Sequence, residues 1–374
     1  MDTLQPLPSV DEMQRAYLAS DASYDGIFLL AVRTTGIFCR PSCRARKPQP
    51  ENVEYFGTTR EALFAGYRPC KRCRPLDTNG RPPEWVRRLL AEIEQSPDLR
   101  IGDSELRRRG IEPARARRFF QQNFGMTFQA YCRARRLGDA FVQIKQGRSI
   151  DAAAYDVGFE SPSGFRDAFV RQFGKPPGSS RNGDCLRIAW LETPIGPMIA
   201  SASARGICLL EFSDRRMLEA QIQTLRRRFQ AAIVPGEHEH LERLRSELRE
   251  YFDGERQEFS VPLEYPGSAF QVRVWEALRT IPSGTTWSYE RLAGEIGSPG
   301  SSRAVGRANG LNRIAIVIPC HRVVNKNGEL SGYGGGVWRK RYLLGLEQAA
   351  YAEPVRATMR LTSAAARREK SSRC

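Results

Sequence analysis

Two short cysteine motifs decide the fold of the first part of the chain: CRPSC at residues 39–43 and CKRC at residues 70–73. Each motif can place two sulfur atoms on one side of a metal ion, and the loop of residues 44–69 can close the other side. Four thiolates in a tetrahedral arrangement are typical of Zn²⁺ sites. The sequence therefore predicts a small zinc-stapled domain at residues 10–80, with one zinc ion bound by Cys39, Cys43, Cys70 and Cys73.

The charge around this cluster leaves two interpretations open. A four-cysteine zinc site in general acts as a structural staple. Here, however, the cysteines lie among cations, which keep thiolates ionised and attract phosphate groups. These cations are Arg40, Arg44, Arg46, Lys47, Arg68, Lys71, Arg72 and Arg74. The alternative interpretation is therefore a zinc-bound thiolate that acts as a nucleophile beside DNA.

Composition and periodicity divide the remainder of the chain. RPPEWVRRLLAEIEQSP at residues 81–97 has apolar side chains at helical spacing between Pro-Pro and Ser-Pro, which predicts a connecting helix. PPGSSRNGD at residues 176–184 has the composition of a linker. Beyond it, the alternation in residues 186–213 predicts a β-sheet, followed by helices at residues 215–230 and 238–253. At least three domains are therefore expected.

Residues 98–180, between these boundaries, have helical spacing throughout. Ser161 is placed to cap a helix on which Phe165, Phe169 and Phe173 recur at four-residue steps. We expect the three rings in the core of a helix-turn-helix, and the opposite face of the same helix in the major groove of DNA. The side chains predicted on that DNA-binding face are Ser163, Arg166 and Arg171, with Asp167 beside them.

A reactive pair follows the apolar stretch that opens IAIVIPCHRVV, residues 314–324. The stretch predicts a buried strand with Cys320 and His321 at its end. Adjacent side chains on a strand point to opposite faces, so the pair alone is a weak sign of catalysis. The chain has only three histidines, and His238 and His240 resemble exposed residues at a helix start. His321 is therefore the candidate base, and Cys320 the candidate nucleophile.

The sequence around the cysteine motifs resembles a known domain. AVRTTGIFCRPSCRAR (31–46) and GYRPCKRC (66–73) are similar to the amino-terminal zinc domain of the Ada family, bacterial DNA-alkylation repair methyltransferases that also activate transcription. The resemblance implies that Cys39 accepts a methyl group from a methyl phosphotriester of the DNA backbone. Because the zinc centre would then lose one negative charge, its repulsion toward phosphates would fall. Methylation of Cys39 is thus expected to act as an electrostatic switch.

The remaining domains also have counterparts in that family. Residues 111–140 and 152–178 resemble an AraC-type DNA-binding domain, although ELRRRGIEPARARR (105–118) departs from its usual pattern and puts the first recognition helix in doubt. Four further blocks resemble, in the same order, the O6-alkylguanine-DNA alkyltransferase family. They are GSAFQVRVWEALRTIPSGTTWSYERLAGEIG (267–297), SRAVGRANGLN (302–312), IPCHRVV (318–324) and SGYGGGVWRKRYLLGLE (331–347).

The alkyltransferase resemblance implies a role for each matched residue. Cys320 matches the alkyl acceptor, whose thiolate is generated through His321 and a water molecule, and Glu347 matches the carboxylate that orients the histidine. Tyr289 matches the tyrosine beside the flipped nucleotide, which hydrogen-bonds to the base. O6 of a paired guanine is buried in the duplex, so the base must leave the stack before the sulfur can reach it.

Other matches concern the DNA and the base pocket. Arg303 matches the arginine finger that fills the gap in the base stack, on the second helix of a minor-groove helix-turn-helix. Asn312 matches the hinge asparagine between that helix and the active-site strand. The residues implied in the guanine pocket are Val323 through its carbonyl, Tyr333, Gly334 and Lys340. The thioether product is stable, and no organic cofactor is expected, so each site should act once.

Charge and composition agree with a nucleic-acid partner. Lys+Arg 58 against Asp+Glu 42 gives a net charge of +16 and a pI of about 9.8, which points to a polyanion. No apolar run approaches the roughly 18 residues of a membrane helix, and nine cysteines without a secretory signal disfavour a disulfide scaffold. We expect a cytoplasmic, nucleoid-associated monomer that binds alkylated and promoter double-stranded DNA and RNA polymerase, and no membrane.

These observations predict a multidomain α/β protein. The zinc domain is α+β, and residues 98–180 form an all-α helix-turn-helix domain. The alkyltransferase is expected to be α+β, with an amino-terminal subdomain at residues 185–265 and a catalytic, winged helix-turn-helix-like subdomain at residues 266–349. A basic tail at residues 350–374 ends the chain. Helices of the catalytic subdomain are expected at residues 269–279, 289–296 and 302–311.

Three functions remain open at this point. The first is irreversible transfer of methyl groups from O6-methylguanine to Cys320 and from phosphotriesters to Cys39, followed by activation of transcription. The second is a zinc-dependent regulator with a vestigial methyltransferase domain, which the complete set of matched residues disfavours. The third is a Cys-His hydrolase, which lacks an oxyanion-hole signature. The helix-turn-helix either reads a promoter or holds DNA nonspecifically.

Overall fold

We describe a computed structural model of the chain that covers residues 7–76, 83–96, 100–180, 185–330 and 332–350. The chain divides into two compact units, Met1–His238 and Glu239–Cys374. Of the predicted basic tail, residues 351–374 lie outside the described residues. No helix in the described part of the chain is long and apolar enough to cross a membrane.

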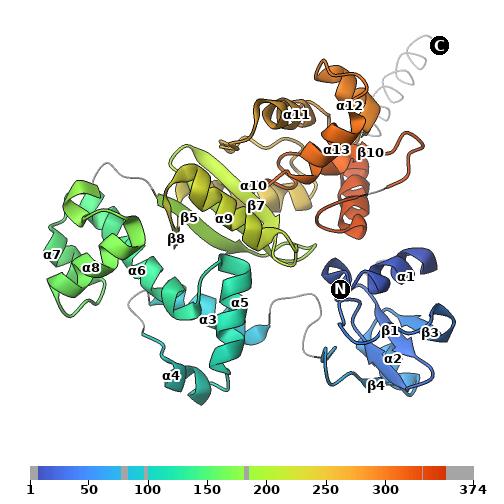
Figure 1. Cartoon of the computed structure of the whole chain (residues 1–374), viewed down its shortest axis with the longest axis horizontal. Helices are drawn as coiled ribbons and strands as arrows, with labels where there is room; N and C mark the ends of the chain where they lie inside the picture. The colour runs from blue at the N-terminus through green and yellow to red at the C-terminus, as the bar shows by residue number, and fades with distance from the viewer. Residues whose placement is uncertain (1–6, 77–82, 97–99, 181–184, 331, 351–374) are drawn as a thin grey trace, which may run out of the picture. The chain divides into compact units, whose positions relative to one another are not determined.

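A four-stranded sheet of order β3-β1-β2-β4 forms the first part of the amino-terminal unit. β1 (Leu29–Val32) pairs antiparallel with β2 (Ile37–Cys39) and β3 (Val53–Phe56), and β2 pairs parallel with β4 (Arg68–Pro69). α2 (Thr59–Phe64) packs against β1, β3 and β4 (Figure 1). The short helices of this part are α1 (Val10–Leu18), η1 (Ala22–Tyr24) and η2 (Pro50–Asn52).

The middle of the chain is helical, as predicted. The segment expected as a connecting helix forms α3, and its Val86 and Leu89 are buried in the same core as Phe120 and Phe124 of α5. α3 is thus a packed part of this helical region. The helices are α3 (Glu84–Gln95), α4 (Asp103–Arg108), α5 (Pro113–Phe124), α6 (Phe128–Lys145), α7 (Ile150–Asp156) and α8 (Pro162–Phe173), followed by η3 (Pro177–Ser180).

The helix-turn-helix signals at the end of this region are confirmed. The Ser161 side chain caps α8 by accepting a backbone N–H, and Gly174 ends the helix with a φ of 74°, a left-handed conformation that glycine adopts without strain. Phe165 and Phe169 are fully buried, and Phe173 packs against the same core. The aromatic face of α8 is therefore inside, and its polar face is left for a partner.

The predicted second sheet has the order β7-β6-β5-β8. β5 (Cys185–Leu191), β6 (Met198–Ser203) and β7 (Gly206–Phe212) form an antiparallel meander. β8 (Ala232–Pro235) returns parallel to β5 after α9 (Leu218–Phe229). β6 and β7 are buried along their whole length.

Helices dominate the carboxy-terminal unit, and the predicted helices agree with them to within one or two residues. The Trp275 side chain is buried, and its Nε1 donates to the Ala308 carbonyl at 2.9 Å, which fixes α11 against α13. The helices are α10 (Glu239–Phe252), α11 (Ala269–Arg279), α12 (Tyr289–Glu295), α13 (Ser302–Gly310) and residues 337–350. β9 (Trp287–Ser288) pairs parallel with β10 (Val323–Val324).

One predicted element is wrong. Residues 314–318 form turns in place of a strand, with Ile316 at a φ of 71° and Ile318 N donating to the Ile314 carbonyl at 3.0 Å. Cys320 opens a short 3-10 helix, η4 (Cys320–Arg322), and the strand begins only at β10. The apolar run is buried as expected, but an apolar run does not distinguish a buried turn from a buried strand.

Candidate zinc centre and alkyl-acceptor site

The four predicted zinc ligands come together in the structure. Cys39 ends β2 and Cys70 follows β4, and the parallel pairing of Phe38 with Pro69 places these cysteines beside each other. The four Sγ atoms all lie within 4.8 Å of one another. Each of Cys39, Cys43, Cys70 and Cys73 is at most 9% exposed.

The chemistry of this donor set fits a zinc ion. Hydrogen bonding to Cys73 and burial raise the pKa of Cys39, and burial raises the pKa of Cys43. Four thiols at this spacing therefore resist joint ionisation unless a cation compensates their charge. Zn²⁺ prefers four thiolates in tetrahedral geometry and would hold all four in the ionised state. The cluster is accordingly a zinc site.

Asp25 holds the first cysteine motif in shape. Its carboxylate accepts hydrogen bonds from the backbone N–H of Ser42, at 3.1 Å, and from the Ser42 hydroxyl. Arg40 Nη1 lies 3.8 Å from the same carboxylate, and Lys47 Nζ donates to the Cys43 carbonyl at 2.9 Å. Two of the cations predicted around the cluster therefore lie at it.

Backbone N–H groups distinguish the sulfur atoms. Arg40 N lies 3.5 Å from the Cys73 sulfur, and the N–H of Ala45 bonds to Cys43. Among the described residues, no backbone N–H donates to the Cys39 sulfur. A thiolate that accepts an N–H bond shares its negative charge with the donor, so Cys39 keeps more nucleophilic character than Cys43 or Cys73.

Asn312 fixes the candidate acceptor in the other unit. Cys320 is 7% exposed, and its Sγ accepts a hydrogen bond from Asn312 Nδ2 at 3.1 Å. The same amide nitrogen donates to the Ile318 carbonyl at 2.9 Å, and Asn312 Oδ1 accepts from Ile314 N at 3.0 Å. One asparagine therefore shapes the turn and stabilises the sulfur as a thiolate.

The structure brings His321 and Glu347 together as predicted. His321 is fully buried, and its Nε2 lies 2.8 Å from Glu347 Oε1. Burial alone would raise the pKa of Glu347, but hydrogen bonds from His321 and Arg322 and the positive charge of Arg322 hold that pKa well below its usual range. Arg322 contributes through Nε and Nη2, each 2.9 Å from a carboxylate oxygen.

These contacts define the protonation state of the histidine. Burial lowers the pKa of His321, and the carboxylate of Glu347 offsets this only in part. An ionised carboxylate only accepts hydrogen bonds, so the neutral imidazole donates from Nε2 and keeps its lone pair on Nδ1. Nδ1 is buried and has no hydrogen-bond partner within the described part of the chain. His321 is therefore a neutral base with a free Nδ1.

The structure also locates the residues predicted for the guanine pocket. Lys340 lies two helical turns before Glu347, and its Nζ donates to the Val323 carbonyl at 2.6 Å. Burial lowers the pKa of Lys340 to about 8. Tyr289 opens α12, and its pKa is raised by burial and by the charge of Cys320. Tyr333 is half-buried and Gly334 exposed, both in the stretch before the helix at residues 337–350.

The predicted DNA-contacting residues are exposed. Arg303 lies on the first turn of α13, and Ser163, Arg166 and Arg171 lie on the polar face of α8. Arg166 forms an ion pair of 2.9 Å with Asp151 of α7. α8 and α13 belong to different units.

Three buried side chains at the acceptor site were not found from the sequence. Asn309 Nδ2 lies 3.4 Å from the Cys320 carbonyl, Arg322 binds Glu347 as described, and the Tyr251 hydroxyl donates to Glu347 Oε1 at 2.8 Å. Arg322 directly follows the Cys-His pair, which could have drawn attention to it. No local pattern connects Tyr251 with a residue 96 positions away.

A buried cysteine beside a histidine–carboxylate pair, combined with a zinc-cysteine domain and a helix-turn-helix, defines the class of self-alkylating DNA repair proteins that also regulate transcription. The chain belongs to the Ada family of this class. Four family descriptions match it in order: "Metal binding domain of Ada" (residues 12–76), "Helix-turn-helix domain" (106–183), "6-O-methylguanine DNA methyltransferase, ribonuclease-like domain" (186–265) and "6-O-methylguanine DNA methyltransferase, DNA binding domain" (269–349).

Relatives of known role cover nearly the whole chain. The "Bifunctional transcriptional activator/DNA repair enzyme Ada" of Escherichia coli is 36% identical, over 89% of this chain and 95% of that protein. The "Regulatory protein ada" of Salmonella typhimurium is 38% identical, over the same shares of 89% and 95%. Among solved structures, Mycobacterium tuberculosis OGT in complex with DNA is 40% identical, covering 44% of this chain and 93% of that one, with a TM-score of 0.38.

Proposed function

We propose that the chain repairs alkylated DNA by two irreversible methyl transfers to its own cysteines, from O6-methylguanine to Cys320 and from methyl phosphotriesters to Cys39. In the methylated state it activates transcription of the alkylation response. The arrangement at Cys320 carries the proposal: a sulfur stabilised by Asn312 at 3.1 Å, next in sequence to a neutral, buried His321. Membership of the Ada family supports both transfers.

The transfer from guanine is a displacement at the methyl carbon. The Cys320 sulfur attacks, the S–C bond forms as the C–O6 bond breaks, and the electron pair of that bond leaves with the guanine. The thiol proton passes to Nδ1 of His321, through a water molecule in the mechanism that the family implies. His321 then releases this proton to solvent and the guanine anion takes up one proton from solvent, so the overall charge is unchanged. Because the product is a thioether, the site acts once.

In the transfer from a phosphotriester, the Cys39 sulfur forms the S–C bond as the bond between the methyl carbon and a phosphate oxygen breaks, and the phosphodiester anion leaves. A zinc ion held by the four cysteines would keep the Cys39 thiolate ionised at neutral pH. The side chains of Arg40 and Lys47, which donate to the Cys73 and Cys43 carbonyls, favour the approach of the DNA backbone. The N–H bonds to Cys73 and Cys43 favour Cys39 over those two cysteines as the acceptor, and the match to the family favours it over Cys70. The methyl thioether carries no charge, so the centre becomes less negative and binds DNA more tightly.

The DNA-contacting and guanine-pocket residues are assigned from their places on the helices and loops. We infer that Ser163, Arg166 and Arg171 contact the major groove, and that Arg303 enters the minor groove and fills the gap left by the base. Tyr289, Lys340 and the Val323 carbonyl, with Tyr333 and Gly334, are assigned to the guanine pocket.

Cellular context is also part of the proposal. We infer that RNA polymerase is a partner of the methylated protein, because activation requires it. The remaining inferences are a monomer in a cytoplasmic, nucleoid-associated location, with the domain boundaries given from the sequence. The net charge of +16 and the exposed polar face of α8 support a DNA-bound protein.

Methylated cysteines can be mapped directly. The protein is incubated with duplexes that carry isotope-labelled methyl groups either on O6 of guanine or on backbone phosphates, and its peptides are analysed by mass spectrometry. We expect label only on Cys320 with the first duplex and only on Cys39 with the second, at one methyl per site. Label on neither cysteine would favour a regulator with a vestigial methyltransferase domain. Release of label as methanol would favour a hydrolase.

A further inference from the structure

Tyr251 contacts the catalytic carboxylate from outside the catalytic domain. We propose that Tyr251 is a positioning residue for methyl transfer to Cys320, acting through Glu347 on the orientation and basicity of His321. This inference rests on the proposed function of Cys320. It extends the acceptor site to α10, which lies in the part of the chain matched by the ribonuclease-like domain, residues 186–265.

The hydroxyl of Tyr251 shares an acceptor atom with the histidine. Tyr251 OH and His321 Nε2 each lie 2.8 Å from Glu347 Oε1, and both side chains are buried, Tyr251 at 2% exposure and His321 at 0%. Burial, followed by the charge of Glu347, raises the pKa of Tyr251 well above its usual value. The hydroxyl therefore stays protonated and donates a charge-assisted bond.

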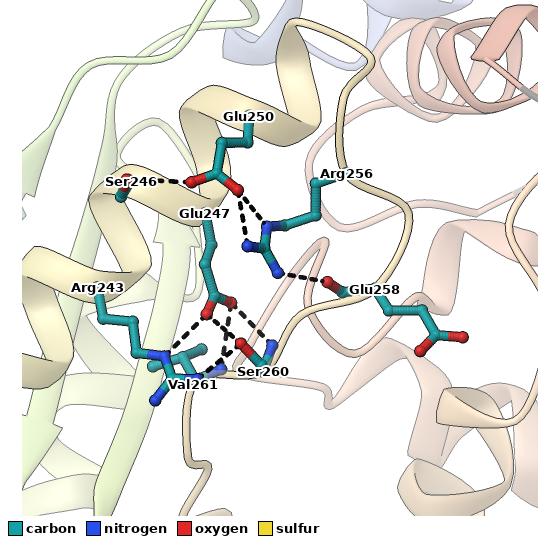
Figure 2. A network of polar contacts seen from close by, with 8 residues as sticks. All are labelled: Arg243, Ser246, Glu247, Glu250, Arg256, Glu258, Ser260 and Val261. Carbon is teal, nitrogen blue, oxygen red and sulfur yellow. Dashed lines mark hydrogen bonds and ion pairs between the residues drawn. The ribbon is translucent and has the colours of Figure 1, made fainter.

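A polar network holds the ring of Tyr251 in place. Figure 2 shows Glu247, one turn before Tyr251 on α10, bound to the loop that follows the helix. The Glu247 carboxylate accepts from the backbone N–H groups of Ser260 and Val261, at 2.9 and 3.1 Å, and from the Ser260 hydroxyl at 2.6 Å. Phe259, the residue before Ser260, packs on the Tyr251 ring with centroids 5.3 Å apart.

A second branch of the network fixes the start of the same loop. Glu250 accepts from Arg256 Nε at 2.7 Å, and Arg256 Nη1 donates to the Glu258 carbonyl at 3.0 Å (Figure 2). The loop is thereby tied to α10 at both ends. The hydroxyl of Tyr251 is thus directed at Glu347 by a supported ring, which is the requirement for precise positioning.

Loss of this hydroxyl should change the titration of the histidine in a defined direction. Without the Tyr251 donor, Oε1 of Glu347 carries more unshared negative charge toward His321, so the imidazolium form gains stability and the pKa of His321 rises. Transfer needs neutral His321 as the base, so the rate should reach its plateau at higher pH. Five charged or titratable groups lie around the His321–Glu347 pair. They are Arg322, Lys340, Cys320, Tyr251 and Tyr333.

Tyr251→Phe in the full-length protein tests the proposal, because it removes the hydroxyl and keeps the ring. The single-turnover rate of transfer from O6-methylguanine in duplex DNA is measured from about pH 5.5 to 9, with DNA affinity and melting temperature in parallel. We expect a midpoint displaced upward by about half a unit, and therefore a rate up to about threefold slower at pH values below the midpoint. Affinity for the duplex should not change, because Tyr251 is buried.

Tyr265→Phe is the matched control. Its hydroxyl accepts one hydrogen bond, at 3.3 Å from Arg279, away from Glu347, so the rate and pH profile should equal those of the unmodified protein. Phe259→Leu is a second variant that loosens the ring and leaves the hydroxyl in place. It should shift the profile in the same direction as Tyr251→Phe, to a smaller extent.

The possible results distinguish failure of the proposed function from failure of the positioning role of Tyr251. If the unmodified protein transfers no methyl group to Cys320, the proposed function fails. If that protein and Tyr265→Phe both transfer while Tyr251→Phe has an unchanged pH profile, the positioning role is wrong. A uniform slowing at every pH with a lower melting temperature would also overturn it, because that pattern indicates a purely structural role.

Discussion

Glu347 collects hydrogen bonds from three other segments of the carboxy-terminal unit. Its two oxygens accept from His321, from Arg322 through two nitrogens, from Tyr251 and, at 3.4 Å, from the backbone N–H of Gly284. The residue is 2% exposed, so water does not compete for these bonds. An ionised carboxylate at this position is therefore a condition of the fold as well as of the reaction.

The depressed pKa of Glu347 predicts how the stability of the protein depends on pH. An unfolded glutamate takes up its proton near pH 4.3, whereas folded Glu347 stays ionised well below that value. Its stabilising contribution is therefore fully present above about pH 4.3 and is lost as the pH falls. Between about pH 6.5 and 3.5, the unmodified protein should lose about 1 kcal/mol of unfolding free energy relative to Glu347→Gln.

Urea unfolding of both proteins at the two pH values measures this difference. Glu290→Gln is the control, because Glu290 is 64% exposed and pairs with exposed Lys326, and surface pairs contribute little. Its difference from the unmodified protein should be the same at both pH values. If the Glu347→Gln difference is equally constant, then Glu347 is not held ionised by its partners.

At the scale of elements, α13 links the DNA-facing surface to the acceptor. Its first turn carries exposed Arg303, and its last turn carries buried Asn309, 3.4 Å from the Cys320 carbonyl. The bond from Trp275 to the Ala308 carbonyl fixes the same turn to α11. Arg303, which we propose enters the duplex, and Asn309, which contacts the acceptor residue, thus lie on one helix.

This arrangement predicts that Arg303→Ala impairs repair of duplex DNA and spares the chemistry. Extrusion of a base costs a few kcal/mol, and loss of the filling side chain should slow transfer from duplex O6-methylguanine by about 10- to 100-fold. Transfer from the free base O6-methylguanine needs no extrusion and should not change. Arg307→Ala, an exposed arginine one turn later on α13, is the control. Equal slowing with both substrates would contradict the arginine-finger role.

Helices were predictable from the sequence where capping and periodicity coincide. α11 begins after Ser268, whose side chain forms a capping box, and its bounds agree with the prediction. The strand predicted at residues 314–318 was wrong, because hydrogen bonds of the Asn312 side chain hold these strand-forming residues in a turn. Such a bond acts over two to six positions in sequence and leaves no periodic signal.

For the whole molecule, the sequence predicted the parts that motifs define and missed the parts that packing defines. The zinc ligands and the Cys320–His321–Glu347 set lie in recognisable blocks, and the structure brings the four cysteines together and places His321 against Glu347. Tyr251 and Asn309 reach the acceptor site by tertiary packing alone. The charge of +16 indicated a polyanionic partner, and the sequence placed the predicted DNA-contacting residues on the helices that form α8 and α13, where the structure leaves them exposed.

The charge of the zinc centre predicts that methylation of Cys39 raises the affinity for DNA and that methylation of Cys320 does not. A zinc ion with four thiolates carries two net negative charges, and methylation of Cys39 removes one of them beside Arg40 and Lys47. Protein methylated on Cys39 should therefore bind unmodified duplex DNA more tightly, and the slope of log K against log salt should steepen by up to about 0.9, the value for one additional phosphate contact. Fluorescence anisotropy between about 50 and 200 mM salt measures both quantities.

Protein methylated only on Cys320, prepared with O6-methylguanine DNA, is the matched control and should keep the affinity of the unmethylated protein. The Cys320→Ala variant, methylated on Cys39, should show the full gain. Equal affinities of the Cys39-methylated and unmethylated proteins at every salt concentration would show that repair of phosphotriesters does not act through the charge of this centre.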